Sequence, residues 1–139
     1  MFETFEHKAD IGIRGIGNSR EEAFGECARA MFSVMANLEK VEAKEEDEVK
    51  AESQDIEGLL VQFLNELLYL RDVKERLYSR FDLYIINDAE GWKLNGKAFG
   101  ESIEKDKHSI KTDVKAASYH QLKVEEKNGK WVAQCVVDT

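Results

Sequence analysis

The chain has 139 residues, with 28 acidic and 20 basic side chains that give a formal net charge of −8 at neutral pH. Its longest apolar runs are far shorter than the roughly 18 residues of a membrane-spanning helix, which excludes a transmembrane protein. The acidic balance argues against autonomous RNA or DNA binding, because proteins that grip phosphates on their own carry a basic surface.

The start of the chain and its two cysteines bear on where the protein works. No basic segment leads into an apolar one after Met1, so we expect no signal peptide and a cytoplasmic location. Cys27 and Cys135 lie far apart and outside any metal-binding spacing, which predicts buried free thiols.

The first part of the chain predicts extended structure, a helix and an exposed acidic segment. Residues 2–16 alternate apolar and polar side chains as strands do. Ser19 and Glu22 have the spacing of a capping box, and the apolar residues after them predict a helix that runs to near Asn37. Residues 39–57 hold nine acids and three lysines. They favour a charged edge strand, with a mobile acidic loop as the alternative.

The middle of the chain predicts the core helix and a hairpin. Apolar residues recur at helical spacing over residues 56–68, and Asp55 or Ser53 is placed to cap this helix. From Phe81 the period changes to two, and the turn residues 87–91 separate two alternating runs that should pair as a hairpin.

The polar, aperiodic residues 101–112 predict a loop that leads to a last hairpin. Asn128 and Gly129 are a strong signal for a two-residue type I′ turn. The register of a ladder without a bulge places Cys135 opposite Leu122, Val137 opposite His120 and Asp138 opposite Tyr119. It also predicts that His120 lies on the core face as a hydrogen-bonded imidazole.

The order of these elements predicts an α+β fold. Residues 1–139 contain no internal repeat and no linker, so we expect one domain. The expected architecture has two layers, in which two amphipathic helices pack on one face of a mainly antiparallel sheet.

No phosphate loop, zinc motif or nucleophile motif occurs, and polar residues at strand ends stand out instead. Asp10 interrupts an apolar strand, and Asp138 and Thr139 follow the last one. Two Asp carboxylates and the α-carboxylate of Thr139 would be oxygen donors of the kind that Ca²⁺ or Mg²⁺ prefers. Lys115 could project over the same end of the sheet. The sequence is also compatible with structural roles for these residues. Asp10 would then be a turn or cap residue, Asp138 part of a frayed terminus and Lys115 an ordinary surface lysine.

Four segments resemble the archease family, and they occur in the family's order along the whole chain. They are residues 7–12 with the helix start 21–24, residues 59–69, residues 114–120 and residues 136–139.

The resemblance implies a function, a partner and a site. Archeases are non-catalytic protein cofactors of the RtcB-type RNA ligase, which acts in tRNA splicing and RNA repair. They promote guanylylation and multiple turnover of the ligase and broaden its use of nucleoside triphosphates. The family binds a divalent metal, expected here to be Ca²⁺, through residues that correspond to Asp10, Asp138 and Thr139. Lys115 corresponds to a further functional position of the family.

Four positions depart from the family's pattern. Lys8 stands where Thr is usual, and its positive charge near Asp10 could weaken metal binding. Ala117 and Ser118 stand where the family more often has a β-branched residue and Thr. Thr139 replaces the usual Ile, which should matter less because the family's ligand there includes the main-chain carboxylate.

Two other classes of function remain alternatives. One is a small metal-dependent hydrolase or nucleotide-acting enzyme that uses Asp10 and Asp138, with His7 or His120 as acid or base. The other is a structural or chaperone-like interaction domain in which the site is inactive.

Overall fold

The computed structural model describes residues 1–139. None of its helices combines the length and the apolar character that a membrane span requires. In chain order the elements are β1 (Phe2–His7), β2 (Asp10–Gly17), α1 (Arg20–Met35), the 3₁₀ turn η1 (Leu38–Lys40), β3 (Glu45–Ser53), α2 (Ile56–Lys74), β4 (Arg76–Asp88), β5 (Gly91–Ser102), α3 (Lys105–His108), β6 (Ala116–Ala117), β7 (Lys123–Lys127) and β8 (Lys130–Asp138).

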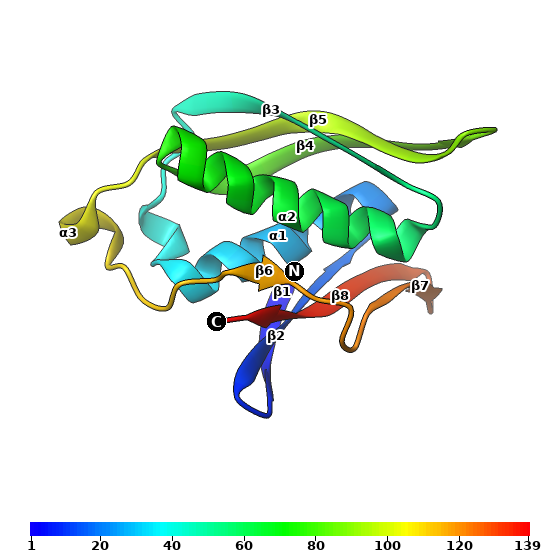
Figure 1. The fold of residues 1–139 in the computed structure, drawn as a ribbon, viewed down its shortest axis with the longest axis horizontal. Helices are drawn as coiled ribbons and strands as arrows, with labels where there is room; N and C mark the ends of the chain where they lie inside the picture. Colours follow the sequence, from blue (N-terminus) through cyan, green and yellow to red (C-terminus); the bar gives the residue numbers. More distant parts are fainter.

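The strands form two antiparallel sheets. One sheet has the order β1-β2-β8-β6, with β7 also paired to β8, and the other has the order β3-β5-β4. Helices α1 and α2 lie between the sheets and contact strands of both (Figure 1). The α+β class and the antiparallel pairing are confirmed, and each sheet carries helices on one face. The division into two sheets differs from the single sheet that was expected.

Helix α1 explains why two sheets are needed. It begins after Ser19, whose Oγ accepts a hydrogen bond of 3.0 Å from the N–H of Glu22, as the capping box predicts. Its buried residues occupy most of its circumference, so one covering sheet would leave apolar surface in water. Strand β2 approaches very closely, since a Cβ on Gly15 would lie 2.2 Å from the carbonyl oxygen of Ala23.

Helix α2 is the predicted core helix. The side chain of Asp55 caps it by accepting a 2.7 Å hydrogen bond from the N–H of Gly58. Phe63 and Leu67 are fully buried in a core of 34 residues, and burying each such side chain contributes about 1.5–3 kcal/mol. The acidic segment before α2 forms β3, which pairs only with β5 and is therefore the charged edge strand that was expected.

The expected single extended segment over residues 2–16 is two strands. β1 and β2 form a hairpin in which His7 lies opposite Asp10. Lys8 and Ala9 form the turn, and Lys8 has the left-handed φ of 55°. Because no Gly, Asn or Asp occupies these two positions, the sequence contains no ordinary turn signal.

The last hairpin keeps its predicted register only near the turn. β7 and β8 pair as expected until Lys123 lies opposite Gln134. Farther along, Val137 pairs with Ala117 in place of His120, a shift of three positions. An odd shift exchanges the two faces of a strand. The expectation that His120 lies in the core is therefore wrong, and its side chain is exposed.

The expected loop over residues 101–112 contains one turn of helix, α3, of which only His108 is buried. His108 in α3 is fully buried, its Nδ1 accepts a 2.9 Å hydrogen bond from the N–H of Glu104, and its Nε2 lies 3.1 Å from a carboxylate oxygen of Glu101. Burial disfavours the charge of Glu101, but hydrogen bonds from the Glu42 N–H, His108 and Lys107 outweigh burial and lower its pKa to about 2.

Candidate metal and partner site

Strand pairing brings Asp10 to Asp138, although 127 residues separate them in the sequence. β2 and β8 pair with Ile11 opposite Val137, and one further step of this register places Asp10 opposite Asp138. The N–H of Thr139 also points at Asp10, with 3.4 Å between the nitrogen and Oδ1. The structure therefore assembles all three residues that the sequence marked as oxygen donors.

The two aspartates carry like charges at one end of a sheet. Neither side chain forms an ion pair with a lysine, an arginine or the N-terminal amine. Asp138 is exposed and Asp10 is half-buried. Like charges directly opposite each other in a sheet are destabilising, so a cation bound between the two carboxylates would favour this arrangement.

The donor set fits a hard cation in kind and supplies part of its coordination. No group of three or more His, Cys, Asp and Glu side chains is arranged to hold a metal. The oxygens of Asp10, Asp138 and Thr139 are the type of ligand that Ca²⁺ accepts, and Ca²⁺ takes about six to eight of them. A cation held here would keep positions for water, for phosphate oxygens or for groups of a partner.

Lys115 lies beside the same strand end, on the side of β8 away from β2. Its N–H donates a 2.8 Å hydrogen bond to the carbonyl oxygen of Asp138, and the next residue, Ala116, pairs with Asp138. The side chain is exposed and forms no ion pair. The backbone of Lys115 thus lies beside Asp138 on the side away from Asp10, and its ammonium group has no partner within the chain.

Asn65 holds the segment that carries Lys115, and sequence patterns did not single it out. Its Oδ1 accepts a 2.8 Å hydrogen bond from the N–H of Ala117, and its Nδ2 lies 3.5 Å from the carbonyl oxygen of the same residue. The side-chain amide thereby supplies β6 with the hydrogen bonds that a neighbouring strand would otherwise make on this side. A polar residue amid the apolar run of α2 was the one available signal.

The two histidines named as acid or base in the enzyme alternative lie near these residues. The rings of His7 and His120 are 6.1 Å apart between centroids, and His7 is the hairpin partner of Asp10. His120 reaches this place because residues 118–121 loop out of the sheet, where the carbonyl oxygen of His120 accepts a 3.0 Å hydrogen bond from the N–H of Val136.

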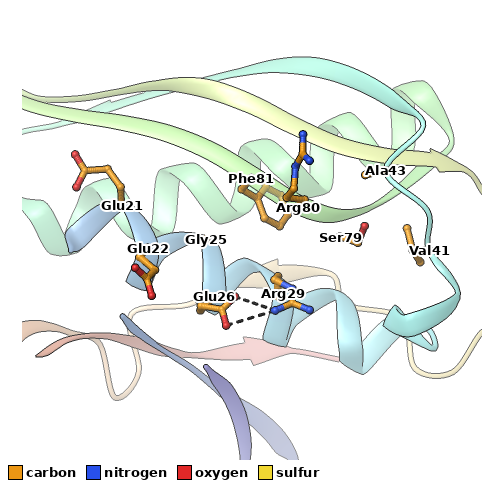
Figure 2. A pocket seen from close by; sticks show the side chains of 10 residues that line it. All are labelled: Glu21, Glu22, Gly25, Glu26, Arg29, Val41, Ala43, Ser79, Arg80 and Phe81. Atoms are coloured by element: carbon orange, nitrogen blue, oxygen red, sulfur yellow. Dashed lines mark hydrogen bonds and ion pairs between the residues drawn. The ribbon is translucent and has the colours of Figure 1, made fainter. Parts of the chain in front are cut away.

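One cleft of the protein lies away from these residues. It measures about 470 Å³ and is bordered by α1, residues 79–81 of β4 and the segment before β3 (Figure 2). Figure 2 shows that Glu26 is committed to Arg29, and Glu26 also pairs with the N-terminal amine. Glu21 accepts a hydrogen bond from the N–H of Ile85. Of the acidic residues that line the cleft, only Glu22 has a carboxylate without a partner, so the cleft does not offer a set of free carboxylates.

The cysteines take no part in the site. Cys27 and Cys135 are free and fully buried, as predicted. Burial, together with the nearby Cys135 thiol, raises the pKa of Cys27, and burial raises the pKa of Cys135 to about 12. Both therefore remain neutral thiols at neutral pH.

Comparisons with known proteins agree along the whole chain. The family model described as the archease protein family (MTH1598/TM1083) matches residues 2–139. The protein named protein archease of Pyrococcus abyssi is 46% identical over 138 residues, which cover 99% of this chain and 97% of that protein. Its namesake from Sulfurisphaera tokodaii is 44% identical over 137 residues, with 99% and 97% covered.

Solved structures give the same result. The solution structure of Methanobacterium thermoautotrophicum protein 1598 aligns with a TM-score of 0.84 at 34% identity, and 99% of this chain and 98% of that chain are covered. The crystal structure of a Thermotoga maritima archease, described as a possible chaperone, aligns with a TM-score of 0.61 at 26% identity. That alignment covers 100% of this chain and 98% of the other.

Proposed function

The chain belongs to the archease family, and from that premise we propose that it is a non-catalytic protein cofactor of an RtcB-type RNA ligase in tRNA splicing and RNA repair. In this role it promotes guanylylation and multiple turnover of the ligase, broadens its use of nucleoside triphosphates, and works in the cytoplasm. One observation carries the proposal: Asp10, Asp138, Thr139 and Lys115 gather at one strand end although they come from three separate segments.

The proposed site holds a divalent cation, with Ca²⁺ as the first candidate, between Asp10 and Asp138. A bound cation would neutralise phosphate charge and orient phosphate oxygens. Lys115 contributes a mobile point charge that can donate to phosphate oxygens on the far side of Asp138. Asn65 keeps β6 in place, so the backbone segment that carries Lys115 stays beside the end of β8.

The charge of the protein supports contact with the ligase in preference to contact with RNA. A net charge of −8 repels a polyphosphate chain, whereas the cation and Lys115 give one local point where phosphate can be received. The protein therefore adds groups to the active site of its partner and leaves the RNA to the ligase.

The test is guanylylation and multiple-turnover ligation by the cognate ligase with and without this protein. We expect stimulation by the wild type and loss of stimulation with Asp10→Ala or Lys115→Ala. The matched controls, Asp82→Ala and Lys50→Ala, remove the same charges from exposed positions outside the site and should stimulate normally. Equal stimulation by all variants would refute the site, and no stimulation by the wild type would refute the function.

The enzyme alternative has a separate readout. His7 pairs with Asp10 across the hairpin and its ring lies 6.1 Å from that of His120. A metal-dependent hydrolase that used these groups would turn over phosphate esters or nucleotides by itself. We expect no such turnover by the isolated protein. Activity that requires the added metal and disappears in Asp10→Ala would overturn the non-catalytic role.

A further inference from the structure

A second cleft lies next to the segment that carries Lys115. It has a volume of about 440 Å³, within the range of sites that accept small ligands or a few side chains, and it opens between α2, the start of β4 and residues 103–113. Its apolar lining consists of Met35, Leu77, Ile103 and Ile110. Ile110 is 46% exposed, so an aliphatic side chain faces water at this place.

Arg71 lines this cleft and also holds the segment that leads to Lys115. Its guanidinium donates to carboxylate oxygens of Asp72 and Asp113 at 2.9 and 3.1 Å, and to the carbonyl oxygen of Val114 at 3.1 Å. Only 13% of the Arg71 side chain is exposed. Because Val114 directly precedes Lys115, a chain seated in the cleft would lie beside the segment that delivers the lysine to the site.

The rim of the cleft offers positive charge. Lys105 and Lys111 line it and form no ion pair, whereas Lys107 is bound to Glu42 and Glu101. The two acidic residues of the lining are the ones that Arg71 already neutralises. The protein as a whole has a net charge of −8. At this rim, by contrast, two lysines without ion-pair partners border the apolar lining of the cleft.

We propose that this cleft, lined by Met35, Leu77, Ile103 and Ile110 and bordered by Lys105 and Lys111, is a docking groove for a partner segment. The occupant is a short acidic segment of the ligase that inserts one large aliphatic or aromatic side chain and places its carboxylates against the two lysines. The inference rests on the proposed function for the identity of the partner. It goes beyond that function by separating binding, which the groove performs, from activation, which Lys115 and the carboxylates perform.

A second copy of this chain fits the groove less well than an acidic partner. A symmetric dimer across this face would bring the lysine-bearing rims of two copies together, and like charges oppose such a contact. An acidic segment neutralises them, and a single anchoring side chain suits a cleft of this size.

The experiment measures ligase guanylylation as a function of the concentration of this protein, together with its direct affinity for the ligase. The double variant Lys105→Glu/Lys111→Glu should raise the half-maximal concentration by about tenfold or more and keep the maximal rate. Ile110→Asp, which changes an exposed side chain and spares the core, should act in the same direction. Lys115→Ala should lower the maximal rate at an unchanged half-maximal concentration. Lys50→Glu/Lys127→Glu, with the same charge change at exposed positions outside the groove, should match the wild type.

The outcomes separate the two proposals. A wild type that activates the ligase, with a double variant that saturates at the same concentration, would overturn the groove and leave the function standing. A wild type that neither binds nor activates the ligase would overturn both. Sedimentation that shows a wild-type dimer, lost in the double variant, would overturn the ligase segment as occupant and assign the groove to a second copy.

Discussion

The role assigned to Asn65 makes a quantitative prediction. In Asn65→Ala, the N–H of Ala117 loses the 2.8 Å bond to Oδ1 and its carbonyl oxygen loses the 3.5 Å contact with Nδ2. Ala117 is only 6% exposed, so water cannot fully replace these partners. A buried polar group left without a partner costs about 1–3 kcal/mol, and the longer contact contributes little. We expect the free energy of unfolding to fall by about 1–2 kcal/mol.

The local effect should be larger than the global one. β6 is held on its other side by the bonds from the Lys115 N–H to Asp138 and from the Ser118 N–H to Val136. Without Asn65 these bonds open more often, so native-state hydrogen exchange should be faster at the amides of Lys115 and Ser118. Urea unfolding measures the global change, and exchange followed by NMR measures the local one.

Two further variants make this reasoning falsifiable. Asn65→Asp keeps an acceptor for the Ala117 N–H and should recover most of the exchange protection. Gln62→Ala, at an exposed position of the same helix, should change neither measurement. If Asn65→Ala lowers the free energy of unfolding while the Lys115 amide exchanges at the wild-type rate, Asn65 stabilises the fold without positioning the lysine.

Three other changes have defined outcomes. Added Ca²⁺ should raise the melting temperature of the wild type above its value in chelator, because a ligand that binds the folded state stabilises it. Asp10→Asn should abolish that increase. Equal increases in both proteins would show that Ca²⁺ binds at a place other than Asp10. Since Glu101 has a pKa lowered from 4.5 to about 2, its ionised form adds stability above pH 4.5 that is lost as the pH falls toward 2. Urea titrations across this interval should show a steeper loss for the wild type than for Glu101→Gln, and identical slopes would contradict the assignment. Gly15→Ala should lower the free energy of unfolding by about 1–3 kcal/mol, because its Cβ would collide with backbone atoms of α1, as urea unfolding will show.

The helices and the hairpins were predictable from local patterns, and the limits of that approach are visible in the last hairpin. The turn at Asn128 and Gly129 set the pairing correctly for the residues next to it. Farther away, Ser118 leaves the ladder, since its Oγ donates a 2.8 Å hydrogen bond to the carbonyl oxygen of Val136, and Gln121 takes a left-handed φ of 54°. Neither Ser nor Gln requires such a loop. The alternation of apolar and polar residues therefore predicted a continuous strand with His120 in the core.

His108 shows a second kind of limit. In sequence it stands among charged residues without periodicity, which is typical of a surface loop. In the structure it is buried because Glu101, the N–H of Glu104 and the Lys107 ammonium form one hydrogen-bonded cluster. Polar residues can enter the interior when every polar atom finds a partner, and the partners here come from the end of β5 and from α3.

The residues of the candidate site could be proposed from the sequence, but their assembly could not. Asp10 and Asp138 could be recognised as carboxylates in apolar surroundings, but only the pairing of β2 with β8 joins them. Strand β8 has neighbours on both sides, β2 on one and β7 with β6 on the other. Its end is therefore flanked twice, which puts Asp10 on one side of Asp138 and Lys115 on the other. A one-residue slip of β8 would turn the Asp138 side chain to the opposite face of the sheet and away from Asp10, so the hydrogen bonds that hold this strand also hold the two carboxylates in register with each other.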